Sequence, residues 1–134
     1  MRHRVAGRKL NRTTSHREAL LESLFRGLVL EFDRKGFIVT TREKAKFAQP
    51  TVEKMITMAG TKNVANVRRA MRMLNDRELV RKLFDEIGPY YKDRPGGYTR
   101  VIRLSTPRLG DNGTRAYFGF VKKNESVAPA AEAS

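Results

Sequence analysis

The chain has 134 residues, of which 28 are Lys or Arg and 14 are Asp or Glu, so its formal net charge is +14, and it contains no cysteine. This length fits one domain, and a hydrophobic content of 40% is enough for a modest core. The composition excludes a disulfide framework, a thiolate zinc site and a cysteine nucleophile, and no apolar run is long enough to span a bilayer. The charge favours a polyanionic partner, nucleic acid first and an anionic membrane second.

The basic charge is concentrated at the N-terminus. Residues 1–17 contain six basic side chains, no acidic one, and too few large apolar residues to fold alone. Arginine dominates this segment, and its guanidinium binds phosphate in a bidentate manner and stacks on bases. We therefore predict that residues 1–15 form an extended arm that becomes ordered on RNA phosphates, with a solvated, disordered tail as the alternative. The segment lacks the apolar stretch of a secretory signal, although it shares its Arg-rich, acid-poor character with mitochondrial transit peptides.

A single globular domain is predicted over residues 16–122. Ser15 and Glu18 have the spacing of a capping box, in which each side chain bonds a backbone N–H at the start of a helix. The apolar residues that follow recur at helical spacing and predict a helix over 16–33. The short β-branched run at 37–41 predicts a strand.

Three further helices are expected in the middle of the chain. The second helix, over 45–59, contains Pro50, which should kink it or make it restart because proline lacks a backbone N–H. The third helix is expected over 63–75. The fourth should begin after Asp76, a favourable N-cap, and should end at Gly88 in the C-cap position.

The third helix has two distinct sides. Its 3-4-3 spacing predicts four side chains directed into the core: Val64, Val67, Met71 and Leu74. Three arginines fall on the opposite side: Arg68, Arg69 and Arg72. Charged helix faces are usually only solvated, but no acidic residue occurs among these arginines. An RNA contact and an ordinary solvated face are therefore both open.

Two more strands are predicted over 98–105 and 115–121, joined by a loop that contains the turn signal Asp-Asn-Gly. The segment from Arg94 to Arg100 combines two arginines with Tyr98 and a diglycine, which lets the backbone approach another surface. Tyr98 could stack on a base while the arginines bind phosphates, or it could belong to the core at the entry to a hairpin. Residues 123–134 are expected to be a disordered tail.

These elements together predict an α/β (α+β) fold, in which about four helices pack on a small mixed three-stranded sheet behind the basic arm. The sequence shows no catalytic constellation, since its two histidines lie in or beside the arm and no phosphate-binding glycine loop occurs. We expect no enzymatic activity, no metal, no cofactor and no small-molecule substrate. A free nucleic-acid-binding regulator and an RNA-modifying enzyme are the rival functions, but the sequence has neither a helix-turn-helix pattern nor a cofactor loop.

Three segments in the same order, MRHRVAGRKLNRTTSHREALL, EKAKFAQPTVEKMIT and VRKLFDEIGPYYKDRPGGYTRVIRL, resemble bacterial large-subunit ribosomal protein family number seventeen. The resemblance extends over residues 1–121. It implies a structural protein on the outer face of the large subunit, near the exit of the polypeptide tunnel, that binds large-subunit rRNA and supports translation. It also implies proteins numbered twenty-two and thirty-two as neighbours, in the cytoplasm of a bacterium or in a bacterial-type organellar ribosome, with no membrane partner.

The resemblance also implies which residues contact rRNA. The basic N-terminal motif of the family is matched here at Arg2, His3, Arg4, Gly7, Arg8, Lys9, Leu10, Asn11, Arg12, His16 and Arg17. The predicted RNA-binding set takes from this motif Arg2, His3, Arg4, Arg8, Lys9, Asn11, Arg12, His16 and Arg17, and it adds Arg68, Arg69, Arg72, Arg94 and Arg100. The RPGG segment that contains Arg94 could instead be a packing turn. Phosphate contacts should dominate, while His3 and Asn11 could read a base edge or a 2′-hydroxyl.

Overall fold

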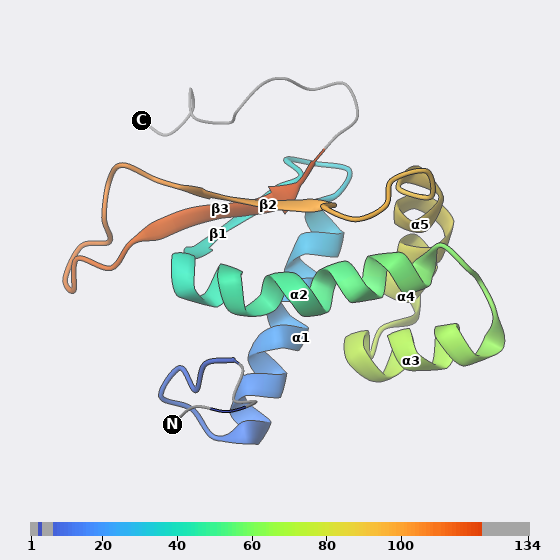
Figure 1. The fold of residues 1–134 in the computed structure, drawn as a ribbon, viewed down its shortest axis with the longest axis horizontal. Helices are drawn as coiled ribbons and strands as arrows, with labels where there is room; N and C mark the ends of the chain where they lie inside the picture. The colour runs from blue at the N-terminus through green and yellow to red at the C-terminus, as the bar shows by residue number, and fades with distance from the viewer. Residues whose placement is uncertain (1–2, 4–6, 122–134) are drawn as a thin grey trace.

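The computed structural model describes residue 3 and residues 7–121, and it confirms the predicted fold class. In chain order the elements are α1 (Thr14–Glu31), β1 (Phe37–Thr41), α2 (Arg42–Ala59), α3 (Val64–Leu74), α4 (Arg77–Lys82), the π-helical turn η1 (Leu83–Ile87), α5 (Gly88–Tyr90), β2 (Thr99–Arg103) and β3 (Arg115–Phe120). The segments α4, η1 and α5 follow one another without a break, so they form the predicted fourth helix. The helices lie on one side of the sheet, with α1 and α2 against it (Figure 1).

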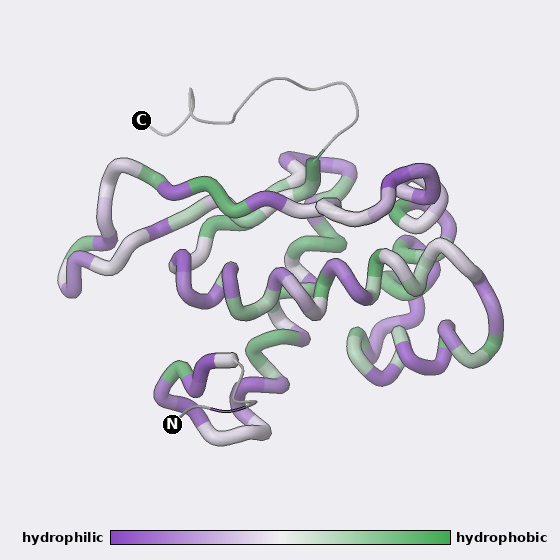
Figure 2. Tube along the Cα trace, in the orientation of Figure 1, coloured by the Kyte–Doolittle hydropathy of each residue, from purple (hydrophilic) through white to green (hydrophobic). Residues whose placement is uncertain are grey.

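The sheet has the order β1-β3-β2, and both of its pairings are antiparallel. The expectation of a mixed sheet is therefore wrong in this detail, because β2 and β3 form a hairpin and β1 also runs opposite to the central strand. Ile38 and Val101 both pair with Phe118, and all three side chains belong to the core between the sheet and the helices. Figure 2 shows hydrophobic residues concentrated in the strands and in the middle of α1.

The first helix begins earlier than the sequence suggests. Thr13, rather than Ser15, is the N-cap, and its side-chain oxygen accepts a hydrogen bond from the backbone N–H of His16 at 3.4 Å. The capping box at Ser15 and Glu18 is therefore wrong. Just upstream, the backbone N–H of Arg12 bonds the carbonyl of Lys9 at 3.1 Å, so a tight turn brings Thr13 into the capping position first.

The second helix is continuous through Pro50, so of the two expected outcomes, a kink or a restart, the restart does not occur. Thr41 caps it by accepting a hydrogen bond from the backbone N–H of Lys44 at 3.4 Å. Buried side chains lie both before and after the proline: Ala45, Ala48, Val52, Ile56 and Ala59. Packing of this stripe against the sheet and α1 maintains the helix across a position where local propensity would interrupt it.

The third helix faces the core with a slightly different set of residues. Ala70 and Leu74 are buried and Val67 and Met71 are half-buried, whereas Val64 is 67% exposed. The inward assignment of Val64 is therefore wrong. Val64 is the first residue of the helix, directly after the N-cap Asn63, and so lies at the exposed end of the apolar stripe.

The predicted end of the fourth helix at Gly88 is also wrong. Gly88 has a right-handed helical φ of −55°, and the helix continues to Tyr90 after the wider π-helical turn at Leu83–Ile87. The glycine is instead needed for close packing, since a Cβ at this position would lie 2.3 Å from the backbone oxygen of Ala59. Local capping rules cannot detect this role, because the obstacle comes from the end of α2.

Two tyrosines close the core beside this helix. Tyr91 is 2% exposed, and its hydroxyl donates a hydrogen bond to the backbone carbonyl of Val121 at 2.7 Å. Its ring packs edge-on against Tyr98, with the centroids 5.3 Å apart, and Tyr98 is itself 5% exposed. Burial raises the pKa of the Tyr91 phenol well above its ordinary value. The Tyr91 hydroxyl therefore remains a hydrogen-bond donor across the physiological range.

Replacing Tyr91 with phenylalanine should lower the free energy of unfolding by about 1 kcal/mol near neutral pH, because the Val121 carbonyl loses its donor. A phenol whose folded pKa is raised stabilises the fold fully below the pKa of free tyrosine, about 10, and this contribution falls as the pH rises toward the folded pKa. The unchanged protein should therefore lose stability above about pH 10 more steeply than the variant does. Urea unfolding at several pH values between neutral and about 11.5 measures how the stability of each protein changes with pH. Equal changes in the two proteins would contradict the hydrogen bond from the buried Tyr91 phenol.

Candidate nucleic-acid interface

The basic side chains of the chain divide into two classes by their partners. Six of them form ion pairs with carboxylates within the described part of the chain: Arg26, Arg34, Arg42, Lys62, Lys82 and Arg108. Nine others belong to the predicted RNA-binding set and form no ion pair with any described carboxylate: Arg8, Lys9, Arg12, Arg17, Arg68, Arg69, Arg72, Arg94 and Arg100. Other described cations outside the set, such as Lys54, Arg77 and Arg81, also form no such pair, so the predicted set is one part of the basic charge that is not neutralised internally.

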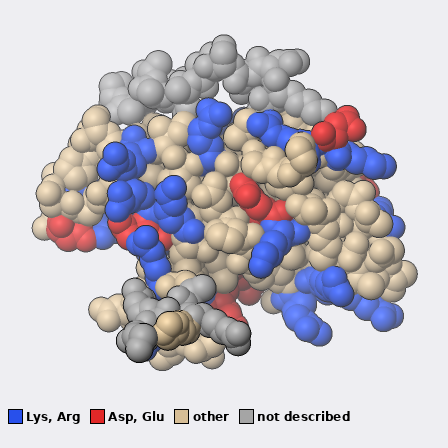
Figure 3. Space-filling model, viewed as in Figure 1, with Lys and Arg blue, Asp and Glu red and all other residues tan. Residues whose placement is uncertain are grey.

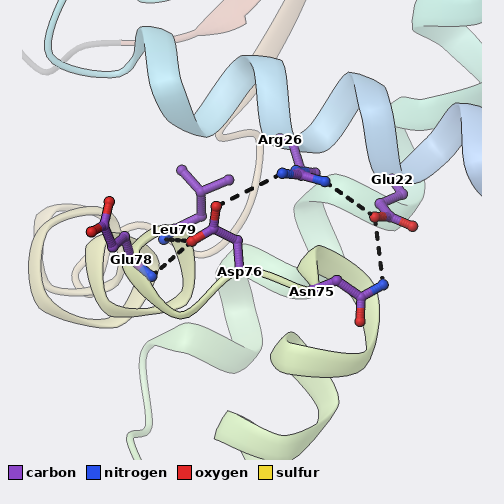
Figure 4. Close-up of polar contacts among 6 residues, drawn as sticks. All are labelled: Glu22, Arg26, Asn75, Asp76, Glu78 and Leu79. Carbon is purple, nitrogen blue, oxygen red and sulfur yellow. Dashed lines mark hydrogen bonds and ion pairs between the residues drawn. The ribbon is translucent and has the colours of Figure 1, made fainter.

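Figure 4 shows how one of the neutralised cations is used. Arg26, on α1, lies 3.5 Å from a Glu22 carboxylate oxygen and 3.7 Å from an Asp76 oxygen. The side-chain amide of Asn75 donates to Glu22 at 3.5 Å, and Asp76 caps α4 by accepting from the backbone N–H groups of Glu78 and Leu79. Arg26 thus joins α1 to the α3–α4 junction, and its role is structural.

The end of the arm is folded into a compact turn against the start of α1. Leu10 and Asn11 both have left-handed backbone conformations, with φ of 53° and 58°. A side-chain nitrogen of Arg12 donates to the ring of His16 at 2.7 Å, and the Arg17 guanidinium donates to the Arg12 carbonyl at 2.7 Å. The structure therefore brings together Arg12, His16 and Arg17, three members of the predicted RNA-binding set. Arg2 and Arg4 lie outside the described residues, while His3, Arg8, Lys9 and Asn11 are exposed.

The first turn of α1 has an unusual charge for a helix N-terminus. It contains His16 and Arg17 but no acidic residue. The helix dipole makes this end partially positive, so nearby cations are unfavourable there and a bound anion is favourable. The exposed N-terminus also presents backbone N–H groups that no preceding turn can satisfy, which is the usual geometry of a phosphate site.

The arginines of α3 form a second, separate basic region. Arg68, Arg69 and Arg72 are all exposed, and they lie opposite the buried Ala70 and Leu74. Figure 1 shows α3 and the N-terminal segment on different parts of the molecule, so the fold does not join the two regions into one patch. Figure 3 likewise shows Lys and Arg side chains in several separate groups over this face, with acidic side chains beside some of them.

The segment from Arg94 to Arg100 resolves one of the alternatives that the sequence left open. Tyr98 is buried and shares a hydrogen bond of 3.0 Å with the Thr57 hydroxyl, so it belongs to the core and does not stack on a base. Gly96 and Gly97 have positive φ values of 123° and 62°, which explains the diglycine as a turn. Arg94 is half-buried, and Arg100 is exposed on the edge strand β2.

Sequence reasoning missed two cations that the fold places beside this set. Arg103 is exposed on the same edge strand as Arg100, and Lys92 is exposed just before Arg94. Neither forms an ion pair with a carboxylate that the structure describes. For Arg103, the available signal was the second arginine of the predicted strand, three residues after Arg100.

The hairpin between β2 and β3 shows the opposite behaviour. Arg108 and Asp111 form a bidentate ion pair across its tip, and Asp111 also accepts from the backbone N–H of Gly113 at 3.1 Å. These bonds hold the pKa of Asp111 far below its usual range. The charge of Arg108 is therefore neutralised within the hairpin tip, and Arg108 is not free to bind an anion.

Other kinds of site find no support within the described ranges. No cluster of three or more metal-ligating side chains occurs among residue 3 and residues 7–121. None of the helices in these ranges combines the length and the apolar character that crossing a membrane requires. The unpaired cations of the basic regions thus remain the best candidates for binding a ligand, and that ligand would be anionic.

Comparisons with known proteins point in the same direction. Residues 24–121 match the family model of ribosomal protein L17, a region that begins within α1 and ends just after β3. The chain is also 43% identical over 128 residues to the large ribosomal subunit protein bL17 of Desulfovibrio desulfuricans, and the alignment covers 96% of this chain and 73% of that protein. The resemblance found in the sequence is therefore confirmed, and the chain belongs to the ribosomal protein L17 family.

Proposed function

We propose that the chain binds large-subunit rRNA through two basic regions, the N-terminal arm and the exposed arginine face of α3, at a position near the exit of the polypeptide tunnel. As a member of its family, the chain is a structural constituent of the large ribosomal subunit, a ribonucleoprotein that carries out translation in the bacterial cytoplasm. Its partners are accordingly rRNA and neighbouring ribosomal proteins. The proteins numbered twenty-two and thirty-two are our proposed neighbours, and the proposed role is structural and not catalytic.

One observation carries the rRNA proposal. Six of the fifteen described basic residues outside the predicted set are paired with carboxylates, whereas none of the nine described basic members of the set is. Cations left unpaired on a protein of net charge +14 attract a polyanion, and each phosphate that they neutralise releases condensed counterions. This release is the main source of affinity for a nucleic acid.

The two regions would act differently. The arm loses conformational freedom when it binds, so its arginines must compensate for that entropy with phosphate contacts. The turn at Leu10 and Asn11 lies beside the first turn of α1, where the partially positive helix end can receive a phosphate. The α3 arginines are already held by a packed helix, so they would fix the orientation of the domain on the RNA.

The α3 region is tested by changing Arg68, Arg69 and Arg72 together to glutamine. If all three contact phosphates, the slope of log K against log salt should become shallower by about 2, since each contact contributes roughly 0.7–0.9. The matched control changes Lys54, Arg77 and Arg81, which are exposed and lack a described carboxylate partner. Filter binding of large-subunit rRNA at several salt concentrations measures both variants. An equal loss in the control would mean that net charge alone, and not this face, determines binding.

The position in the subunit needs a separate experiment. Native ribosomes are sedimented through a sucrose gradient in high salt, and the protein should run with the large subunit. Migration as a free protein would instead favour the rival function of a free nucleic-acid-binding regulator. A photo-reactive side chain at the fully exposed Leu109 in the purified subunit should then crosslink to protein twenty-two or thirty-two, or to a nascent chain. Crosslinks only to other proteins would contradict the proposed location.

A further inference from the structure

A pocket of about 350 Å³ opens between the end of α2, the segment α5 and the loop before β2. This volume lies within the range of about 300–1,000 Å³ typical of small-ligand sites. Three buried side chains form its apolar walls: Ile56, Tyr91 and Tyr98. Lys92, Arg94 and Pro95 line it from the loop, and Thr61 lines it from the turn after α2. The pocket lies apart from the arm and from the arginine face of α3.

The polar atoms inside this pocket are already committed to other partners. The hydroxyls of Thr57 and Tyr98 are bonded to each other at 3.0 Å, and the Thr57 hydroxyl also lies 3.0 Å from the Glu53 carbonyl. The Tyr91 hydroxyl donates to Val121. The accessible lining of the pocket is about equally polar and apolar, which suits a flat heterocycle with polar edges better than a purely apolar group.

The edge of the pocket is positively charged. Lys92 is exposed and Arg94 is half-buried, and neither forms an ion pair with a carboxylate in the described ranges. The Arg94 guanidinium lies close enough to Tyr91 for its charge to act on the phenol. A ligand that fits both parts has a flat aromatic body and an anionic group at one end.

We propose that this pocket receives one unstacked nucleotide of the bound rRNA, with its base in the pocket and its phosphate at Lys92 and Arg94. The inference rests on the proposed rRNA binding and adds a specific contact to it. Proteins recognise single-stranded RNA by taking up bases that have left the stack, often against aromatic side chains or arginine. In this proposal Tyr98 packs in the core, and Arg94 at the edge of the pocket supplies a phosphate contact.

The test uses the full chain bound to large-subunit rRNA. Ultraviolet crosslinking at 254 nm followed by mass spectrometry should place a nucleotide on the peptide that contains residues 91–98. Chemical probing should show one nucleotide whose base is protected by the protein. Replacing Thr61 with tryptophan fills the pocket without changing charge, and it should remove that protection at least fivefold while leaving the protections made by the arm unchanged. The same replacement at Thr106, exposed on the hairpin, is the control.

A second variant keeps the test decisive if the tryptophan disturbs the fold. Changing Lys92 and Arg94 to alanine removes the phosphate contacts but not the pocket, and it should weaken the same single protection. Crosslinks at the arm without any at residues 91–98, and with no nucleotide altered by either variant, would overturn the inference and leave the proposed function intact. The absence of rRNA crosslinks anywhere would overturn the proposed function itself. Saturation of the pocket by free adenosine or guanosine monophosphate, with rRNA protections unaffected, would show that a free nucleotide is the ligand and would also overturn the inference.

Discussion

Replacing Gly88 with alanine is expected to lower the free energy of unfolding by about 3 kcal/mol, at the upper end of the usual cost of overpacking. The added Cβ would lie 2.3 Å from the backbone oxygen of Ala59 and 2.9 Å from its carbonyl carbon. Both obstacles belong to the backbone at the end of α2, so no side-chain rotation can relieve the contact. Either α5 or the end of α2 must move, and Tyr91 would lose packing as well.

The matched control is alanine at Gly27, in the interior of α1. Its Cβ would meet only the Cγ2 atom of Ile38 at 3.7 Å, which is an ordinary contact. Since glycine is the weaker helix former, this variant should be more stable than the unchanged protein by about 0.5–1 kcal/mol. Thermal and urea unfolding of the unchanged protein and of the Gly88 and Gly27 variants should show changes in stability of opposite sign for the two variants. A Gly88 variant as stable as the unchanged protein would show that α2 and α5 do not approach so closely.

Changing Arg4, Arg8 and Arg12 to alanine is expected to weaken binding to large-subunit rRNA about 100-fold near 0.1 M salt. The salt dependence should also become shallower by about 2 in the slope of log K, because three phosphate contacts no longer release counterions. Arg8 is exposed, Arg12 is held by its bond to His16, and Arg4 lies outside the described residues. Titrations at several salt concentrations measure both quantities, and an unchanged slope would refute the role of the arm.

The control for the arm changes the same three residues to lysine. Lysine keeps each charge, so the salt slope should stay as it is, whereas the affinity should fall modestly because bidentate phosphate contacts are lost. Circular dichroism of both variants checks that α1 still begins correctly, since Arg12 contacts His16 in its first turn. A reduced slope in the lysine variant would mean that the arm acts through its structure and not through its charge.

Much of the fold was predictable because the responsible signals are local. The strand at 37–41 was recognised from its β-branched residues, and the cap at Asp76 was recognised from its side chain. The strand at 115–120 was recognised from its alternating pattern. In each of these cases a residue's own chemistry and that of its immediate neighbours determine the conformation.

The errors share a different cause. The start of α1 was misplaced because two hydroxyl residues compete for the cap, and the turn before Thr13 decides between them. Pro50 did not interrupt α2, since packing on both sides of it maintains the helix. Gly88 resembled a helix C-cap but is required by the backbone of Ala59, which lies 29 residues earlier in the chain.

The candidate interface shows the same division. The excess of positive charge and the arginine-rich arm are properties of the sequence. Which cations remain available is not, because the carboxylates that neutralise Arg26, Lys62 and Lys82 come from distant segments. Arg68 and Arg26 look alike in the sequence, yet only the second is paired with carboxylates in the folded protein.

The sequence by itself determined that this is a basic, single-domain α+β protein with an N-terminal arm suited to phosphates, because composition, periodicity and capping act over a few neighbouring residues. The tertiary structure alone decided that Tyr98 belongs to the core, that Gly88 is a packing residue and that Lys92 and Arg94 border a pocket. Each of these depends on distances between segments far apart in the chain, and those distances are fixed only when the helices pack against the sheet.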